Sequence, residues 1–168
     1  MSYASLHSSC ILVGILLSCA TLGTQASAQK PGVRGTPTRE EIALKTKGMR
    51  LDDARAATAA KDGKTARFTP AVLDVKDENA LASGTVVGRV NTEIETVSLR
   101  PGAYDLFVVK IDGKWKAYAA SENGTEVVEA ASAEVDRRGG GNGRPQLKLG
   151  SLTIIIDMMF YKLSYTWN

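Results

Sequence analysis

Residues 104–121, YDLFVVKIDGKWKAYAAS, constrain the fold more than any other part of the chain. Two runs of alternating side-chain character flank the dipeptide Asp112-Gly113, which is typical of the two-residue type I′ turn of a β-hairpin. A turn of this kind fixes the pairing of the two strands. The pairs predicted on one face are Ile111 with Lys114, Val109 with Lys116 and Phe107 with Tyr118, and those on the other are Lys110 with Trp115, Val108 with Ala117, Leu106 with Ala119 and Tyr104 with Ser121.

The two faces of this hairpin differ in chemistry. One places large aliphatic side chains opposite alanines, which suits close packing, so we expect it to face the core. The other gathers Phe107, Tyr118, Lys114 and Lys116. Aromatic rings beside cations can hold a sugar, an anionic polymer or a partner protein, so this is the candidate ligand-binding face. The alternative is that lysine stems lie over ordinary strand aromatics on a solvated face of the frame.

Other segments with a period of two surround the hairpin and indicate a mainly β protein. Strands are expected at 67–75, 84–90, 93–99 and 125–135. Pro70 is expected to confine the first of these to a sheet edge. The Glu and Ala content of the last leaves a helix open as an alternative. Short strands at this spacing predict an antiparallel β-sandwich or barrel, with its core in residues 64–135.

A Gly-rich flexible linker, residues 136–145, precedes the C-terminal strands expected in residues 146–168. Apolar side chains there occupy even positions from Leu152 to Phe160 and odd positions from Tyr161 to Trp167. Such a change of phase without a turn residue indicates a β-bulge, or alternatively two strands that meet at a sharp bend. We expect this tail to complete the sandwich core, although alternating aromatics at a C-terminus also resemble the last strand of an outer-membrane barrel.

A helical segment is expected in residues 38–63, after a leader at 29–37 whose Gly and Pro content predicts disorder. Thr38 and Glu41 have the spacing of a capping box, and the segment is rich in Ala, Glu, Lys and Arg. Gly48 weakens the helix by about 1 kcal/mol relative to Ala, so a break at that residue is the alternative to one continuous helix.

Residues 1–28 have the layout of a secretory signal peptide, so we expect export to the periplasm or the extracellular space. The segment contains no Lys, Arg, Asp or Glu, and the run Ile11 to Leu17 is apolar but too short to span a bilayer as a helix. Ala26-Ser27-Ala28 is a small-x-small cleavage pattern. The alternative is lipidation at Cys19, because the sequence Leu-Leu-Ser-Cys that ends there resembles the lipobox of bacterial lipoproteins.

The histidine and cysteine content excludes several kinds of catalytic site. The only histidine is His7 and the only cysteines are Cys10 and Cys19, all within the expected signal peptide. In the chain that follows it, Ser-His-Asp and Cys-His catalysis, His- or Cys-ligated metal sites and disulfides are excluded. We therefore expect no enzyme activity and no cofactor.

The charged residues add two expectations. The formal net charge is +3 and no run of like charges supplies a basic patch, so nucleic acid is not an expected partner. Asp52-Asp53 and Asp77-Glu78 are adjacent acids, which leave a carboxylate-dependent hydrolase as an alternative function. A solvated acidic surface is the simpler explanation of both pairs.

Leu99, Pro101, Gly102 and Tyr104 form a Leu-x-Pro-Gly-x-Tyr turn that leads into a strand. The stretch from Leu99 to Val109 resembles a recurring element of bacterial secreted sandwich modules, the carboxypeptidase-regulatory-like and transthyretin-like families. The resemblance implies a sandwich fold and an accessory or binding role, and it implies no active site.

Together these features predict an exported, non-enzymatic β-sandwich of the cell envelope. Its expected role is that of a binding or assembly module, with an envelope protein or a polysaccharide as partner. Membrane contact is expected only through a lipid on Cys19. An outer-membrane-associated lipoprotein or barrel component is the alternative.

Overall fold

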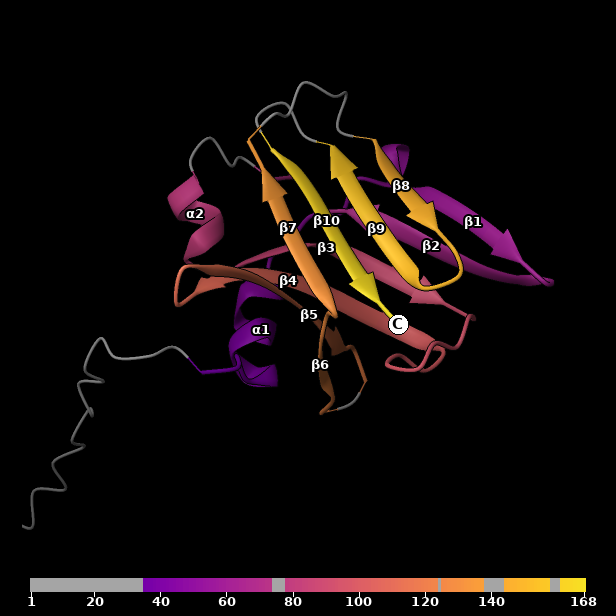
Figure 1. The fold of residues 1–168 in the computed structure, drawn as a ribbon, viewed down its shortest axis with the longest axis horizontal. Helices are drawn as coiled ribbons and strands as arrows, with labels where there is room; N and C mark the ends of the chain where they lie inside the picture. The colour runs from indigo at the N-terminus through magenta and orange to yellow at the C-terminus, as the bar shows by residue number, and fades with distance from the viewer. Residues whose placement is uncertain (1–34, 74–77, 124, 138–143, 158–160) are drawn as a thin grey trace, which may run out of the picture. The chain divides into compact units, whose positions relative to one another are not determined.

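The computed structural model describes residues 35–73, 78–123, 125–137, 144–157 and 161–168. They form two antiparallel sheets with two α-helices and a 3-10 turn, so the expected mainly β, antiparallel class is confirmed (Figure 1). In chain order the elements are α1 (Arg39–Thr46), the 3-10 turn (Asp53–Arg55), β1 (Ala57–Lys61), β2 (Lys64–Pro70), α2 (Glu78–Ala82), β3 (Thr85–Thr92), β4 (Gly102–Ile111), β5 (Lys114–Ser121), β6 (Val127–Glu129), β7 (Ser132–Asp136), β8 (Pro145–Lys148), β9 (Leu152–Asp157) and β10 (Lys162–Trp167).

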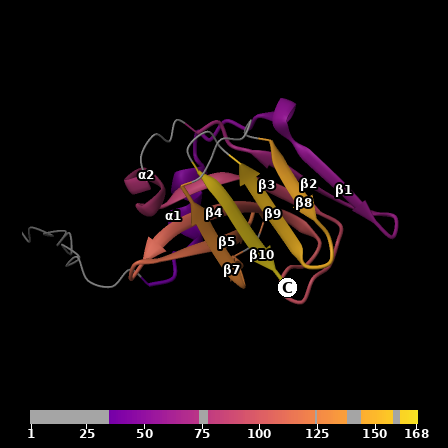
Figure 2. The same cartoon turned by 45° about the horizontal axis from the view of Figure 1, so that its top comes forward.

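The core lies between the two sheets. The first sheet is a six-stranded meander in the order β1-β2-β3-β4-β5-β6, and the second has the order β7-β10-β9-β8. In both views β7 and β10 of the second sheet cross over β4 and β5 of the first (Figures 1 and 2). The large side chains that fill the space between the sheets are Phe68, Val87, Val90, Tyr104, Leu106, Val108, Leu152, Ile154, Ile156, Leu163, Tyr165 and Trp167.

The hairpin formed by β4 and β5 has the predicted register at every pair, from Tyr104 with Ser121 to Ile111 with Lys114. Asp112 and Gly113 have φ of 50° and 76°, the positive values that a type I′ turn requires. The aliphatic face of the hairpin, opposite alanines, packs into the core as expected. At the start of β4, the Tyr104 hydroxyl donates a hydrogen bond to the Arg100 carbonyl at 2.9 Å, which ties the strand to the turn before it.

A second apolar cluster lies on the other face of the first sheet, and α1 covers it (Figure 1). The capping box predicted for this helix is present, with Thr38 as the N-cap and Glu41 returning the hydrogen bond. Ile42 is the buried side chain of α1 and packs into the cluster. A helix with one buried apolar residue contributes little hydrophobic free energy, so its position depends on polar contacts as well.

The predicted helical segment ends earlier than residue 63. The helix stops at Thr46, two residues before Gly48, whose φ is +84°. Residues 57–61 form the edge strand β1 instead, paired with β2 across an Asp62-Gly63 turn with φ of 52° and 75°. Ala-rich sequence favours a helix locally, but backbone pairing to β2 through a type I′ turn outweighs that preference.

Two details of the predicted meander are wrong. Residues 93–99 form a loop. Thr96 and Leu99 bond to each other there: the Thr96 amide donates to the Leu99 carbonyl at 2.9 Å, and the Leu99 amide donates to the Thr96 hydroxyl at 2.9 Å, so these groups do not pair with a neighbouring strand. Pro70 does not mark an edge, since β2 lies between β1 and β3. The β1 ladder ends at the pair of Ala57 with Phe68, so the proline lies beyond the last residue that β1 contacts.

The segment 125–135 is extended, not helical, but it divides between the sheets: β6 completes the first sheet and β7 begins the second.

In the tail, the change of phase reflects two strands, β9 and β10, that pair antiparallel with Leu163 opposite Ile156. The alternative of two strands is therefore confirmed and the bulge is wrong. The centre of the predicted linker, 138–143, lies outside the described residues, whereas Asp136 and Pro145 at its ends belong to strands.

Candidate functional site

The aromatic face predicted as a binding surface is covered by α1. Phe107 is 5% exposed and Tyr118 is 1% exposed, and both pack in one cluster with Ile42 of α1. Burial raises the pKa of the Tyr118 hydroxyl, which also interacts with Thr36 ahead of the helix. The expectation of a solvated aromatic face is therefore wrong, because a helix distant in sequence packs on it.

The two lysines of that predicted face are separated from its rings. Lys114 is exposed beside the hairpin turn. Lys116 forms an ion pair with Glu129 of β6, and this hydrogen bond raises the pKa of its ammonium. The structure thus places the four predicted residues on one side of β4 and β5 without bringing them together as an open site.

A polar cluster centred on Asp105 joins α1 to the first sheet. The Asp105 carboxylate is 2% exposed and accepts hydrogen bonds from Arg89 Nε at 2.9 Å and from Thr46 Oγ1 at 3.2 Å. Arg89 also donates to Glu122 at 2.7 Å. At the start of the helix, Arg39 Nε donates to the Ser121 carbonyl at 2.7 Å. The bonds of Thr46 and Arg39 hold the two ends of α1 against β4 and β5.

Replacement of Asp105 by Asn is expected to lower the free energy of unfolding by about 2 kcal/mol, because it removes the buried one of the two carboxylates that Arg89 contacts, the other being the more exposed Glu122. Asp53→Asn is the matched control. Its partner is Arg67 and its side chain is 78% exposed, so we expect a change within about 0.5 kcal/mol. Urea denaturation of both variants checks this, and equal losses would contradict a structural role for the buried pair.

Two of the acids considered for a hydrolase, Asp52 and Glu78, form ion pairs with basic side chains. Arg55 hydrogen-bonds Asp52 at 2.6 Å and holds the pKa of that carboxyl below its ordinary value. Lys110 at 2.9 Å, together with Arg137, does the same for Glu78. A carboxyl held ionised by a cation is a poor general acid near neutral pH. Asp77 lies outside the described residues.

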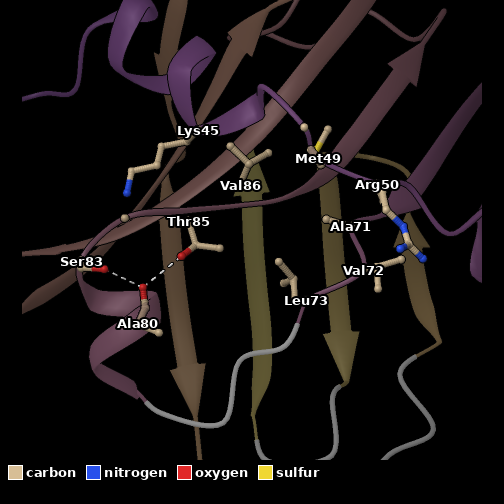
Figure 3. A pocket seen from close by; sticks show the side chains of 12 residues that line it. Lys45, Met49, Arg50, Ala71, Val72, Leu73, Ala80, Ser83, Thr85 and Val86 are labelled. Atoms are coloured by element: carbon tan, nitrogen blue, oxygen red, sulfur yellow. Dashed lines mark hydrogen bonds between the residues drawn. The ribbon is translucent and has the colours of Figure 1, made fainter.

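A pocket of about 380 Å³ opens beside α1, between the helix end, the segment after β2 and the start of β3. Three local features shape it. The chain turns at Gly48 after α1, and the residues that follow lie antiparallel to residues 70–72, where the Val72 amide donates to the Arg50 carbonyl at 2.8 Å. On the opposite side α2 ends, and the hydroxyls of Ser83 and Thr85 both donate to the Ala80 carbonyl (Figure 3).

The pocket combines apolar walls with cationic flanks. Met49 and Val86 lie on one side of it, with Leu73 across from them, and Lys45 and Arg50 stand at opposite sides (Figure 3). Among the described residues that line it, these two carry charge and none is acidic. Neither cation forms an ion pair within the described part of the chain. The described side chains of the lining therefore carry a net positive charge, which favours an anion.

Sequence reasoning missed this pocket, because its lining comes from three segments that share no motif. The one sequence feature that relates to the pocket is the expected helix break at Gly48, because the chain after this break places Met49 and Arg50 in the lining.

The described residues contain no group of three His, Cys, Asp or Glu side chains that could hold a metal ion. Cys19 and the predicted signal peptide lie outside the described residues.

Comparison of the chain with protein-family models, with curated proteins and with solved structures found no match. The resemblance to secreted sandwich modules therefore rests on Leu99, Pro101, Gly102 and Tyr104 alone. Within the described residues, no helix combines the length and the apolar character needed to cross a membrane.

Proposed function

We propose that this chain is an exported, non-enzymatic binding module of the cell envelope, and that the pocket beside α1 is its ligand site. The observation that carries the proposal is the lining of that pocket: apolar walls flanked by cations that have no ion-pair partner in the described chain. Concave, largely apolar sites with a few polar groups are the usual form of small-molecule sites.

The ion pairs of the acidic residues favour binding over hydrolysis. A glycosidase of the two-carboxylate type needs one carboxyl kept protonated while the other is ionised. In this chain both Asp52 and Glu78 have pKa values lowered by neighbouring cations. These carboxylates support the fold, and no carboxylate is among the described residues that line the pocket.

Export is proposed from the signal-peptide layout of residues 1–28, and intact mass with cell fractionation tests it. The full-length chain is expressed in a bacterial host that has both secretion and lipoprotein-processing machinery. A mass that begins at Gln29, in the periplasmic or secreted fraction, is the expected result. A diacylglyceryl mass on Cys19 would support the lipoprotein form of the same proposal. Uncleaved chain in the cytosol would contradict export.

A further inference from the structure

We propose that the ligand of the pocket is a small amphipathic anion, whose apolar portion lies against Met49, Val86 and Leu73 and whose acidic group is held by the cationic flanks. This inference deepens the proposed function and rests on it. The class of ligand follows from the chemistry and the size of the lining.

The apolar walls specify the body of the ligand. A volume of about 380 Å³ lies at the small end of the range known for ligand sites, so it suits a short alkyl chain or a small aromatic group of two or three rings. The hydroxyls of Ser83 and Thr85 both donate to Ala80, so neither proton remains for a ligand.

The flanks specify the charge. Lys45 belongs to the last turn of α1, and Arg50 follows the turn at Gly48. Both side chains are exposed, neither has an ion-pair partner in the described chain, and no acidic side chain is among the described lining residues. An anion gains from either contact, whereas a cation of the same shape is repelled.

A fluorescence titration tests the proposal. The probe is anilinonaphthalene sulfonate, an aromatic anion, titrated into the folded exported chain, with octanoate and octanol as competitors of equal chain length. We expect one saturable site, displaced by octanoate more effectively than by octanol. Added salt should weaken the binding, because dissolved ions screen the attraction between an anionic ligand and solvent-exposed cations.

Charge variants locate the site. Lys45→Gln and Arg50→Gln should each weaken octanoate binding roughly threefold, as for a single exposed ionic contact, and the double variant roughly tenfold. Lys47→Gln is the matched control: it removes an exposed charge next to the helix end without altering the lining, and should change nothing.

The outcomes separate the two levels of the proposal. Saturable binding in which octanol competes as well as octanoate and the charge variants have no effect would overturn the anionic ligand class while leaving the pocket as a binding site. If Lys47→Gln loses as much affinity as Lys45→Gln, the anionic ligand class is overturned as well, because the effect of charge would then be general and not specific to the pocket. If none of the three compounds binds saturably, both the proposed ligand class and the proposed role of the pocket as a ligand site are overturned.

Discussion

Gly88→Ala is expected to lower the free energy of unfolding by about 3 kcal/mol or more, one of the two largest effects we predict for a single substitution. Gly88 follows a register shift in β3, where the pairing with β4 steps from Val86 to Gly88. A Cβ at this position would lie 2.5 Å from the Thr69 carbonyl oxygen and 2.6 Å from the Phe68 ring. Its φ of +155° adds strain for any residue with a side chain.

Neither neighbour of Gly88 can move freely. Thr69 contributes backbone inside the first sheet, and Phe68 is fully buried in the core. The control is Gly35→Ala, because a Cβ at Gly35 meets no atom within 4 Å, and we expect a change within about 0.5 kcal/mol. Urea denaturation followed by circular dichroism measures both. A Gly88→Ala variant as stable as the control would contradict the close approach of Phe68 and Thr69 to this bulge.

Trp167→Ala is the other large effect, with an expected loss of about 3–5 kcal/mol, because it removes the largest fully buried side chain. Trp167 lies on β10 opposite Leu152 and fills the core between the sheets. Its indole N–H lies 3.5 Å from the Val128 carbonyl of β6 in the first sheet, a weak hydrogen bond, so most of the loss comes from packing.

Tyr165→Phe on the same strand separates packing from hydrogen bonding. The Tyr165 hydroxyl is buried and has no hydrogen-bond partner among the described residues, and burial raises its pKa well above the ordinary value. Its removal keeps the ring, so stability should stay the same or rise by up to about 1 kcal/mol. Guanidinium denaturation followed by circular dichroism compares the two variants. A Trp167→Ala protein as stable as Tyr165→Phe would show that β10 does not close the core.

The sequence was sufficient for elements whose signals are local. The dipeptide Asp112-Gly113 determines a turn, and the turn determines the register of all the pairs between β4 and β5. The capping box of Thr38 and Glu41 likewise needs only residues within one helical turn. Such features depend on backbone geometry that a few neighbouring side chains decide.

Elements decided by contacts distant in the chain were not predictable in the same way. Residues 57–61 read as a helix because alanine favours one, and only their pairing with β2 makes them a strand. The same Asp-Gly signal was present at Asp62-Gly63, but no alternating run flanks it, so the hairpin was missed. The phase change in the tail allowed both a bulge and two strands, since the intervening residues include no typical turn former.

The candidate site shows the same limit. The pattern of β4 and β5 correctly placed Phe107 and Tyr118 on one face, but a period of two gives only the side of the sheet. Whether that side faces water depends on α1, which lies more than 60 positions earlier than Phe107 in the sequence. The pocket depends equally on long-range assembly, because residues 45–50, 71–73 and 80–86 meet only in the folded chain.

Amide chemical-shift mapping of the isotope-labelled exported chain tests the pocket most directly. Titration with octanoate is expected to shift a compact set of amide signals, those of Gly48, Met49, Thr85 and Val86, and to leave the hairpin turn at Gly113 unchanged. Shifts that centre on Gly113 and Lys114, or that scatter over exposed lysines without saturating, would contradict a ligand site beside α1.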